Sequence, residues 1–127
     1  MRSYDVAVAS VAIDAPAKWT DNLLSQHAIP DVVSAHRGVA RRIRHAALIR
    51  IALIRQLHVR LGVSVADGVE IAAQVLDSES AGVHVSGQLT LCVDLTELER
   101  RLAERLVEAL ESVPATRRGR PPARRRT

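Results

Sequence analysis

The stretch HAALIRIALIRQLHVRLGVSV, which runs from His45 to Val65, decides the fold because its apolar residues recur at helical spacing. Gly62 is the natural end of the predicted helix, since glycine adopts the left-handed conformation of a C-terminal cap. A second helix is expected to begin within Val63 to Asp67 and to pack back on the first through a short turn. The prediction is therefore one strongly amphipathic helix over His45 to Leu61, with its apolar face formed by Leu48, Ile51, Ile54, Leu57 or Leu53, and Leu61.

Two short helices are predicted upstream of this segment. Ser3 or Asp5 can cap the first, which would run through Ile13, although an edge strand is the alternative there. Asp14-Ala15-Pro16 is a start signal for the second, because Asp14 can cap and proline is tolerated in a first helical turn. This helix covers residues 15 to 26 with its capping segment, and its apolar face holds Trp19 and Leu23. Its polar, donor-rich face holds Lys18, Asn22, Ser25 and Gln26.

A small arginine-bearing hairpin is expected between these helices and the His45 helix. Its strands would be Val32-Val33 and residues 39 to 43, joined by a turn around residues 34 to 38. Arginines on a tight turn beside a two-helix unit suit contacts to a DNA backbone, while a solvated loop is the alternative. The arginines concerned are Arg37, Arg41, Arg42 and Arg44.

Residues 78 to 113 are predicted to form a β-hairpin and a long helix. Side chains from Gly82 to Val93 alternate on either side of Ser86-Gly87, as in a hairpin. Asp94 or Thr96 can cap the helix, which would continue to about Val113. Its apolar seam is a candidate dimerisation surface, with packing on the chain's own hairpin as the alternative. The dimerisation residues proposed from the seam are Leu98, Leu102, Leu106 and Leu110.

The chain closes on a basic segment, RRGRPPARRRT, from Arg117 to Thr127. Its Arg-Gly-Arg-Pro core resembles an AT-hook, because Pro121 keeps Arg120 out of a helix and Gly119 has no Cβ to meet a groove wall. The resemblance implies that guanidinium groups enter a narrow A·T-rich minor groove. A tail that contacts any polyanion, or one that only aids solubility, is the alternative. The predicted contacts are Arg117, Arg118, Gly119, Arg120, Pro121, Arg124, Arg125 and Arg126.

Charge is divided sharply along the chain. Residues 1 to 62 carry nine basic and four acidic side chains, a net charge of +5, whereas residues 63 to 113 carry three and ten, a net charge of −7. Residues 114 to 127 add six arginines and no acid. The overall charge of +4 therefore hides two basic ends, suited to polyanions, around an acidic block suited to a basic protein partner.

Composition narrows the class of protein. With 127 residues, 47% of them hydrophobic but only 2% aromatic, the chain can build an aliphatic core. No apolar run reaches the roughly 20 residues that a membrane helix needs, and no signal peptide is evident, so we expect a cytoplasmic, nucleoid-associated bacterial protein. Cys92 is the only cysteine, the histidines lack metal-ligand spacing, and no nucleophile or phosphate-loop motif occurs. We therefore expect no enzyme activity, no metal and no cofactor.

The order of segments resembles the MerR-like winged helix-turn-helix regulators over roughly residues 4 to 77. The likeness rests on the two short helices, the arginine-bearing wing, the Ile29-Pro30 step and the Leu-Gly-Val-Ser-Val junction at residues 61 to 65. Residues 20 to 23 replace the arginine-tyrosine pair of that family's second helix, and residues 83 to 93 add a hairpin. The resemblance implies DNA binding, with the recognition-helix face formed by Lys18, Asn22, Ser25 and Gln26 and the wing bearing Arg37, Arg41 and Arg42.

The resulting prediction is a mainly α, α+β protein with three parts. Residues 1 to 77 would form the winged DNA-binding domain, residues 78 to 113 the hairpin and dimerisation helix, and residues 114 to 127 a disordered basic tail. The predicted function is a homodimeric transcriptional regulator that reads double-stranded DNA. The alternatives are an architectural DNA-binding protein and an antitoxin-like or adaptor-like dimer that binds a protein through residues 63 to 113.

Overall fold

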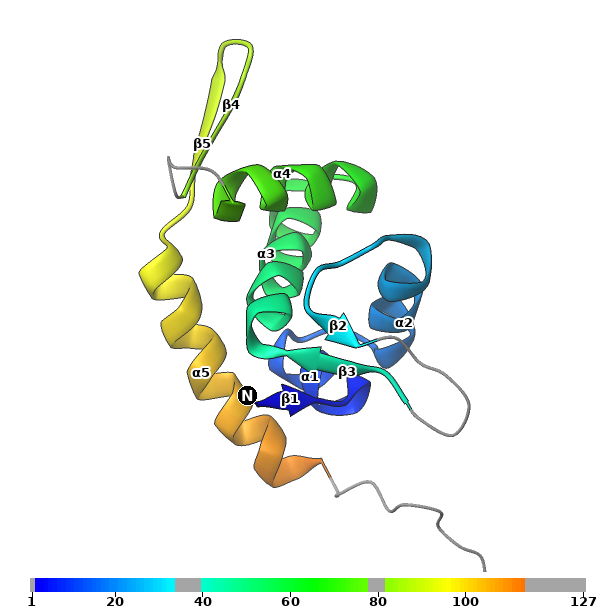
Figure 1. Ribbon diagram of the computed structural model, residues 1–127. Coiled ribbons are helices and arrows are strands. Elements are labelled where there is room, and N and C mark those ends of the chain that lie inside the picture. The colour runs from blue at the N-terminus through cyan, green and yellow to red at the C-terminus, as the bar shows by residue number, and fades with distance from the viewer. Residues whose placement is uncertain (1, 34–39, 78–81, 114–127) are drawn as a thin grey trace, which may run out of the picture.

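The computed structural model describes residues 2–33, 40–77 and 82–113, which are mainly helical with two small antiparallel sheets (Figure 1). The coarse prediction of a mainly α protein with some β structure is confirmed. The elements in chain order are β1 (Ser3–Tyr4), α1 (Val6–Ala12), α2 (Ala17–Gln26), β2 (Val32–Val33), β3 (Arg42–Arg44), α3 (His45–Leu61), α4 (Val65–Asp77), β4 (Val83–Ser86), β5 (Leu89–Cys92) and α5 (Leu95–Ser112).

The helix α3 is the centre of the molecule, and its bounds and its Gly62 cap are as predicted. Gly62 has φ 69°, and the N–H of the next residue, Val63, donates to the Leu57 carbonyl at 3.2 Å, which closes the helix end. The predicted single apolar face of α3 contains fewer residues than the structure buries. Four consecutive residues, 51 to 54, are buried, because the helix is covered from several sides at once, by α4, α5 and the sheet.

Helix α4 packs on α3 and begins at Val65, within the range Val63 to Asp67, as predicted. The Ser64 hydroxyl accepts from the Asp67 N–H at 3.1 Å and so caps its first turn. Gly68 allows a close approach of the two helices, since a Cβ at that position would lie 3.3 Å from Cγ2 of Ile54. A small residue at this crossing therefore sets how near α4 lies to the core.

The first sheet joins the chain's beginning to the segment before α3. Its strand order is β1-β3-β2, and both pairs are antiparallel. The strand β1 was not predicted, because the sequence indicated a helix, or alternatively an edge strand, only after these residues. Ile43 lies opposite both Tyr4 and Val32 and is fully buried, whereas Arg42 and Arg44 on either side of it are exposed. Ile43, flanked by two arginines, and Tyr4 are therefore the residues that join this sheet to the core.

The start of α2 differs from the prediction, although the helix itself covers the expected residues. Pro16 occupies the cap position in an extended conformation, without a side-chain hydrogen bond. Asp14 has φ 59° in the turn between α1 and α2, too far upstream to reach the first free N–H groups. The predicted Asp14 cap is thus wrong. At α1, in contrast, the Asp5 carboxylate accepts from Val8 N–H at 2.8 Å, as predicted.

The hairpin of β4 and β5 and the Asp94-capped helix α5 are present where the sequence predicted them. The apolar seam of α5 packs against α1, and Leu102, Leu106 and Ala109 join the same core as α3. The described parts of residues 1 to 77 and 78 to 113 therefore share one core. None of the described helices is both long and apolar enough to cross a bilayer.

One buried polar contact holds α1 to α2. The Ser10 hydroxyl donates to Oγ1 of Thr20 at 2.7 Å, and both side chains are buried. Replacing Thr20 with valine keeps the shape but leaves the Ser10 hydroxyl without this partner. We expect T20V to lower the free energy of unfolding by about 1–3 kcal/mol in urea titrations. The double variant S10A/T20V should lose less than the two single variants together, and strictly additive losses would contradict the coupling.

Candidate nucleic-acid interface

The helix α2 is fixed to the body by one face and leaves the opposite face exposed. Thr20 and Leu23 are fully buried, and the Trp19 ring packs toward α3, with the Arg55 guanidinium 4.9 Å from the ring centre. The predicted recognition residues all lie on the exposed face: Lys18, Asn22, Ser25 and Gln26. Lys18, Asn22 and Gln26 make no hydrogen bond or ion pair with any described residue, so their polar groups remain available.

Arg41 brings the arginine-bearing segment onto this face of α2. Its Nη2 donates to the Ser25 hydroxyl at 3.1 Å, and its Nη1 lies 3.4 Å from Oδ1 of Asp21. Two residues that the sequence predicted as separate contacts, Arg41 and Ser25, are therefore neighbours on one surface. We call the surface formed by Lys18, Asn22, Ser25, Gln26 and Arg41 the α2 surface.

The acid in this surface was missed by sequence reasoning. Asp21 is exposed and carries negative charge beside Arg41. The signal was present, since Asp21 and Ser25 are four residues apart and so share a helix face. Asp21 holds the guanidinium in place but also lowers the positive charge of the surface.

The remaining predicted arginines are distributed differently. Arg42 donates from Nη2 to the Ser3 carbonyl at 2.8 Å and from Nε to the Ser3 hydroxyl, so it ties β3 to β1. Arg44 is exposed at the start of α3. Arg37 and the arginine-rich tail, residues 114 to 127, lie outside the described residues. Of the predicted wing arginines that are described, only Arg41 contacts α2 through a hydrogen bond or ion pair.

The predicted dimerisation residues are mostly enclosed within the chain. Leu102 and Leu106 are buried, Leu98 is half-buried, and Leu110 alone is more exposed, at 42%. Within the described chain the seam packs on α1 and on α3, and not on the β4–β5 hairpin that was the predicted alternative. Most of the seam is therefore covered within the chain, and Leu110 remains its most exposed member.

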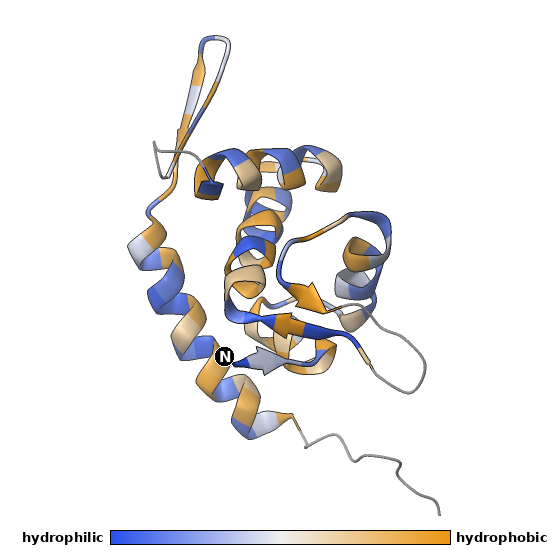
Figure 2. Ribbon diagram, in the orientation of Figure 1, coloured by the Kyte–Doolittle hydropathy of each residue, from blue (hydrophilic) through white to orange (hydrophobic). Residues whose placement is uncertain are grey.

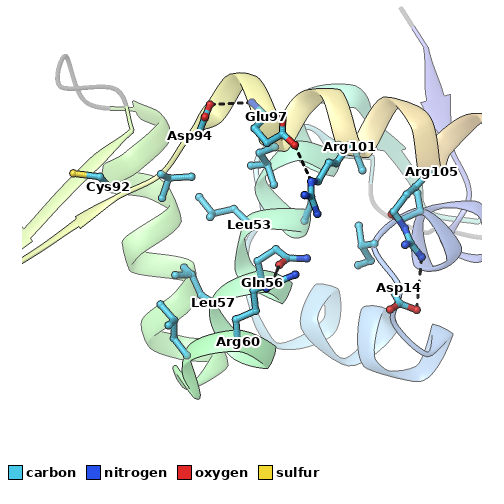
Figure 3. A pocket seen from close by; sticks show the side chains of 17 residues that line it. Asp14, Leu53, Gln56, Leu57, Arg60, Cys92, Asp94, Glu97, Arg101 and Arg105 are labelled. Carbon is cyan, nitrogen blue, oxygen red and sulfur yellow. Dashed lines mark hydrogen bonds and ion pairs between the residues drawn. The ribbon is translucent and has the colours of Figure 1, made fainter.

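A separate groove of about 580 Å³ lies between α3, α5 and the end of α1 (Figure 3). Leu53, Leu57 and Leu102 form part of its buried floor, and its charged groups contact one another at the rim. Arg105 donates to the Ala12 carbonyl at 3.2 Å and lies 3.7 Å from Asp14, while Arg101 binds Glu97. Within the described ranges, no group of three or more His, Cys, Asp or Glu side chains is arranged to hold a metal ion.

No known protein family, curated protein sequence or solved structure matches the chain. The α2 surface is therefore interpreted from its own residues. What they provide is a set of exposed donors on one rigid helix, joined by one guanidinium group from the segment before β3. Such a set suits an acceptor-rich, negatively charged partner.

Glu97 at the groove rim is held ionised by two arginines. Arg100 donates to both carboxylate oxygens, at 2.9 and 2.7 Å, and Arg101 donates at 2.8 Å. These bonds, from Arg100 first and Arg101 second, lower the pKa of Glu97 to about 2. Arg100 also bonds Glu104, and its carboxylate partners raise its pKa.

Because folding lowers the pKa of Glu97, its contribution to stability is fully present above about pH 4.5 and is lost as the pH falls toward 2. We expect E97Q to lower the melting temperature slightly at neutral pH, and this difference to vanish in acid. The effect is small because the group is exposed and screened by salt. E99Q, an exposed site on the same helix, is the matched control for thermal melts across a pH series. A difference between wild type and E97Q that grows in acid would contradict the assignment.

Proposed function

We propose that the chain is a DNA-binding regulator that reads double-stranded DNA with the α2 surface. The observation that carries the proposal is the convergence of Arg41 with the exposed donors of α2. Base edges in the major groove offer acceptors to such side chains, and phosphates bind guanidinium groups. A helix that carries the donors and a neighbouring arginine can therefore engage bases and backbone together.

Each residue of the surface has a definite role in this proposal. The Asn22 amide can form a bidentate pair with adenine, and Lys18 or Gln26 can reach a guanine or adenine edge. Arg41 contacts a phosphate, where it contributes affinity but little sequence discrimination. Asp21 limits that affinity, since it carries negative charge toward a polyanion.

The order of the elements supports a winged helix-turn-helix of the MerR-like kind. Two short helices precede the strands β2 and β3, which pair with each other; β3 also pairs with β1, and α3 follows it directly. The buried Ser10–Thr20 contact and Leu23 fix α2 against the body, and Arg42 anchors β3 to β1. A rigidly held helix beside a short paired segment is what groove docking requires.

The basic tail is proposed as a second contact. Its Arg-Gly-Arg-Pro core would enter an A·T-rich minor groove while α2 occupies the major groove. Its six arginines lie beyond α5, whose exposed residues are rich in glutamate and so unsuited to DNA. The division of labour would give the tail most of the salt dependence and α2 most of the sequence preference.

Substitutions on the α2 surface separate base reading from backbone contact. We expect N22A to lose about 1–3 kcal/mol of discrimination between preferred and random duplexes, because a bidentate base pair is removed. R41A should instead weaken binding to all duplexes alike and lower the salt slope by about one, because a single phosphate contact is lost. D21N should strengthen binding, since it removes a negative charge from the surface.

The measurement is enrichment from a randomised duplex library, followed by fluorescence anisotropy in a salt series with the full chain. R101A, an exposed arginine of α5, serves as the control and should leave affinity and site ranking unchanged. If N22A retains the wild-type ranking of sites, α2 does not read bases. An architectural DNA-binding role would then explain any binding that remains.

Removal of residues 114 to 127 tests the tail. The truncated chain should bind less tightly at every salt concentration and should lose any preference for A·T-rich over mixed duplexes of equal length. A second variant, with Arg118 and Arg120 replaced by lysine, keeps the charge and should lose the A·T preference while it retains most of the affinity. An unchanged A·T preference in both proteins would refute the minor-groove role.

A further inference from the structure

The β4–β5 hairpin carries apolar side chains into solvent. It stands out from the body beyond α4, at the end of the molecule away from the first sheet (Figure 1). Val85 is 61% exposed and Leu89 is 77% exposed, and hydrophobic residues recur along both strands (Figure 2). A two-stranded hairpin is marginally stable in water unless further strands or packing support it. The hairpin therefore exposes an apolar surface to solvent, and a partner that covers this surface would stabilise it.

The root of the hairpin is joined to the end of α4 by hydrogen bonds. The Gly82 N–H donates to the Val75 carbonyl at the end of α4 at 2.9 Å, and His84 bonds Gln74 of the same helix. Gly82 itself has φ 86°, and a Cβ there would lie 2.8 Å from the Val93 carbonyl oxygen. The contacts to α4 come mainly from β4, and β5 has no strand partner among the described residues besides β4.

The outer edge of β5 has backbone groups ready for another strand. The Val93 N–H donates to the Gly82 carbonyl at 2.7 Å, and in an antiparallel pair such bonded positions alternate with unbonded ones. Thr90 and Cys92 are therefore the positions whose N–H and C=O groups point out of the hairpin. Both residues are exposed, and β5 pairs with no described strand except β4.

Natural sheets protect such edges with charge, proline or a bulge, and this hairpin has none of these. Residues 82 to 93 contain no Asp, Glu, Lys, Arg or Pro, and β4 pairs with β5 in unbroken register. The rest of the chain, in contrast, is rich in charged side chains. At the hairpin, two identical edges can meet without bringing like charges face to face.

We propose that the hairpin pairs with the hairpin of a second copy of this chain, β5 against β5, to form a continuous four-stranded antiparallel sheet. A two-fold axis through this edge satisfies the same backbone groups in both copies, as a symmetric dimer requires. The resulting sheet reaches a strand number that is stable in water. The interface replaces the α5 seam as the dimer surface and supplies the partner of the proposed DNA-binding unit.

The position of the hairpin is compatible with DNA binding. It extends from the α4 and α5 end, whereas α2 and the first sheet lie at other sides of the body (Figure 1). Two copies joined at their hairpins would keep both α2 surfaces exposed. The pairing is tested without DNA. Either the pairing or the proposed function can therefore fail while the other stands.

Proline substitution at matched edge positions tests the pairing. T90P removes an outward N–H of β5 and blocks strand addition while it spares the bonds inside the hairpin. V85P removes the outward N–H of β4, opposite Thr90, and is the matched control. Sedimentation equilibrium of the full chain, with a thiol reductant throughout, should give a dimer for wild type and V85P and a monomer for T90P. T90K, a milder change at the same edge, should raise the dimer dissociation constant at least tenfold.

A further variant decides between this surface and α5. Val107 is 57% exposed on α5, and V107K should leave the dimer intact. A monomeric wild-type chain at all concentrations would overturn the proposal. So would a dimer that V107K dissociates and that T90P and T90K leave intact, because that result places the contact on α5. Circular dichroism of each variant confirms that the helices are retained, and a T90P chain that is unfolded leaves T90K as the deciding measurement.

Discussion

The burial of α3 on nearly every side is the constraint on which the rest of the structure depends. Ile51 and Ile54 are fully inaccessible, and the elements around them come from both ends of the chain. A helix of this kind cannot be stable alone in water, because it would expose apolar residues around most of its circumference. Helices α4 and α5 and the strand β3 each cover one side of α3, whereas α1 packs on α5, α2 and β3, so the core is built around α3.

The polar features of the molecule are arranged around that shell. Trp19 lies on the side of α2 that faces α3, where the Arg55 guanidinium stacks on its ring. The opposite side of α2 is left to its polar residues. Arg41 then links the segment before β3 to that polar side. The α2 surface is thus a product of core packing, since the same helix that supplies Leu23 to the core presents Asn22 to solvent.

Local patterns allowed most of the elements to be predicted. Periodicity located α2, α3, the hairpin and α5 to within a few residues, and capping residues marked the end of α3 and the start of α5, because those signals lie within each segment. What covers each apolar face could not be predicted in this way. The α5 seam packs on α1, which lies some ninety residues upstream, as the hydrogen bond from Arg105 to Ala12 illustrates. Strand β1 likewise pairs with β3 across some forty residues of sequence. The contact of Arg41 with α2 is likewise a matter of tertiary geometry, whereas the four recognition candidates share a face by spacing alone.

The packing of α5 on α1 affects how the protein folds during its synthesis. Val8, Ala9 and Ala12 of α1 are buried, yet α5, the helix that packs against α1, is synthesised after all the other described elements. Domains fold as units during synthesis, and contacts between distant residues form late because a long loop must first close. Helix α1 therefore remains incompletely covered until α5 has been synthesised, and a chain that stops before residue 95 leaves the α5-facing side of α1 exposed, which favours aggregation.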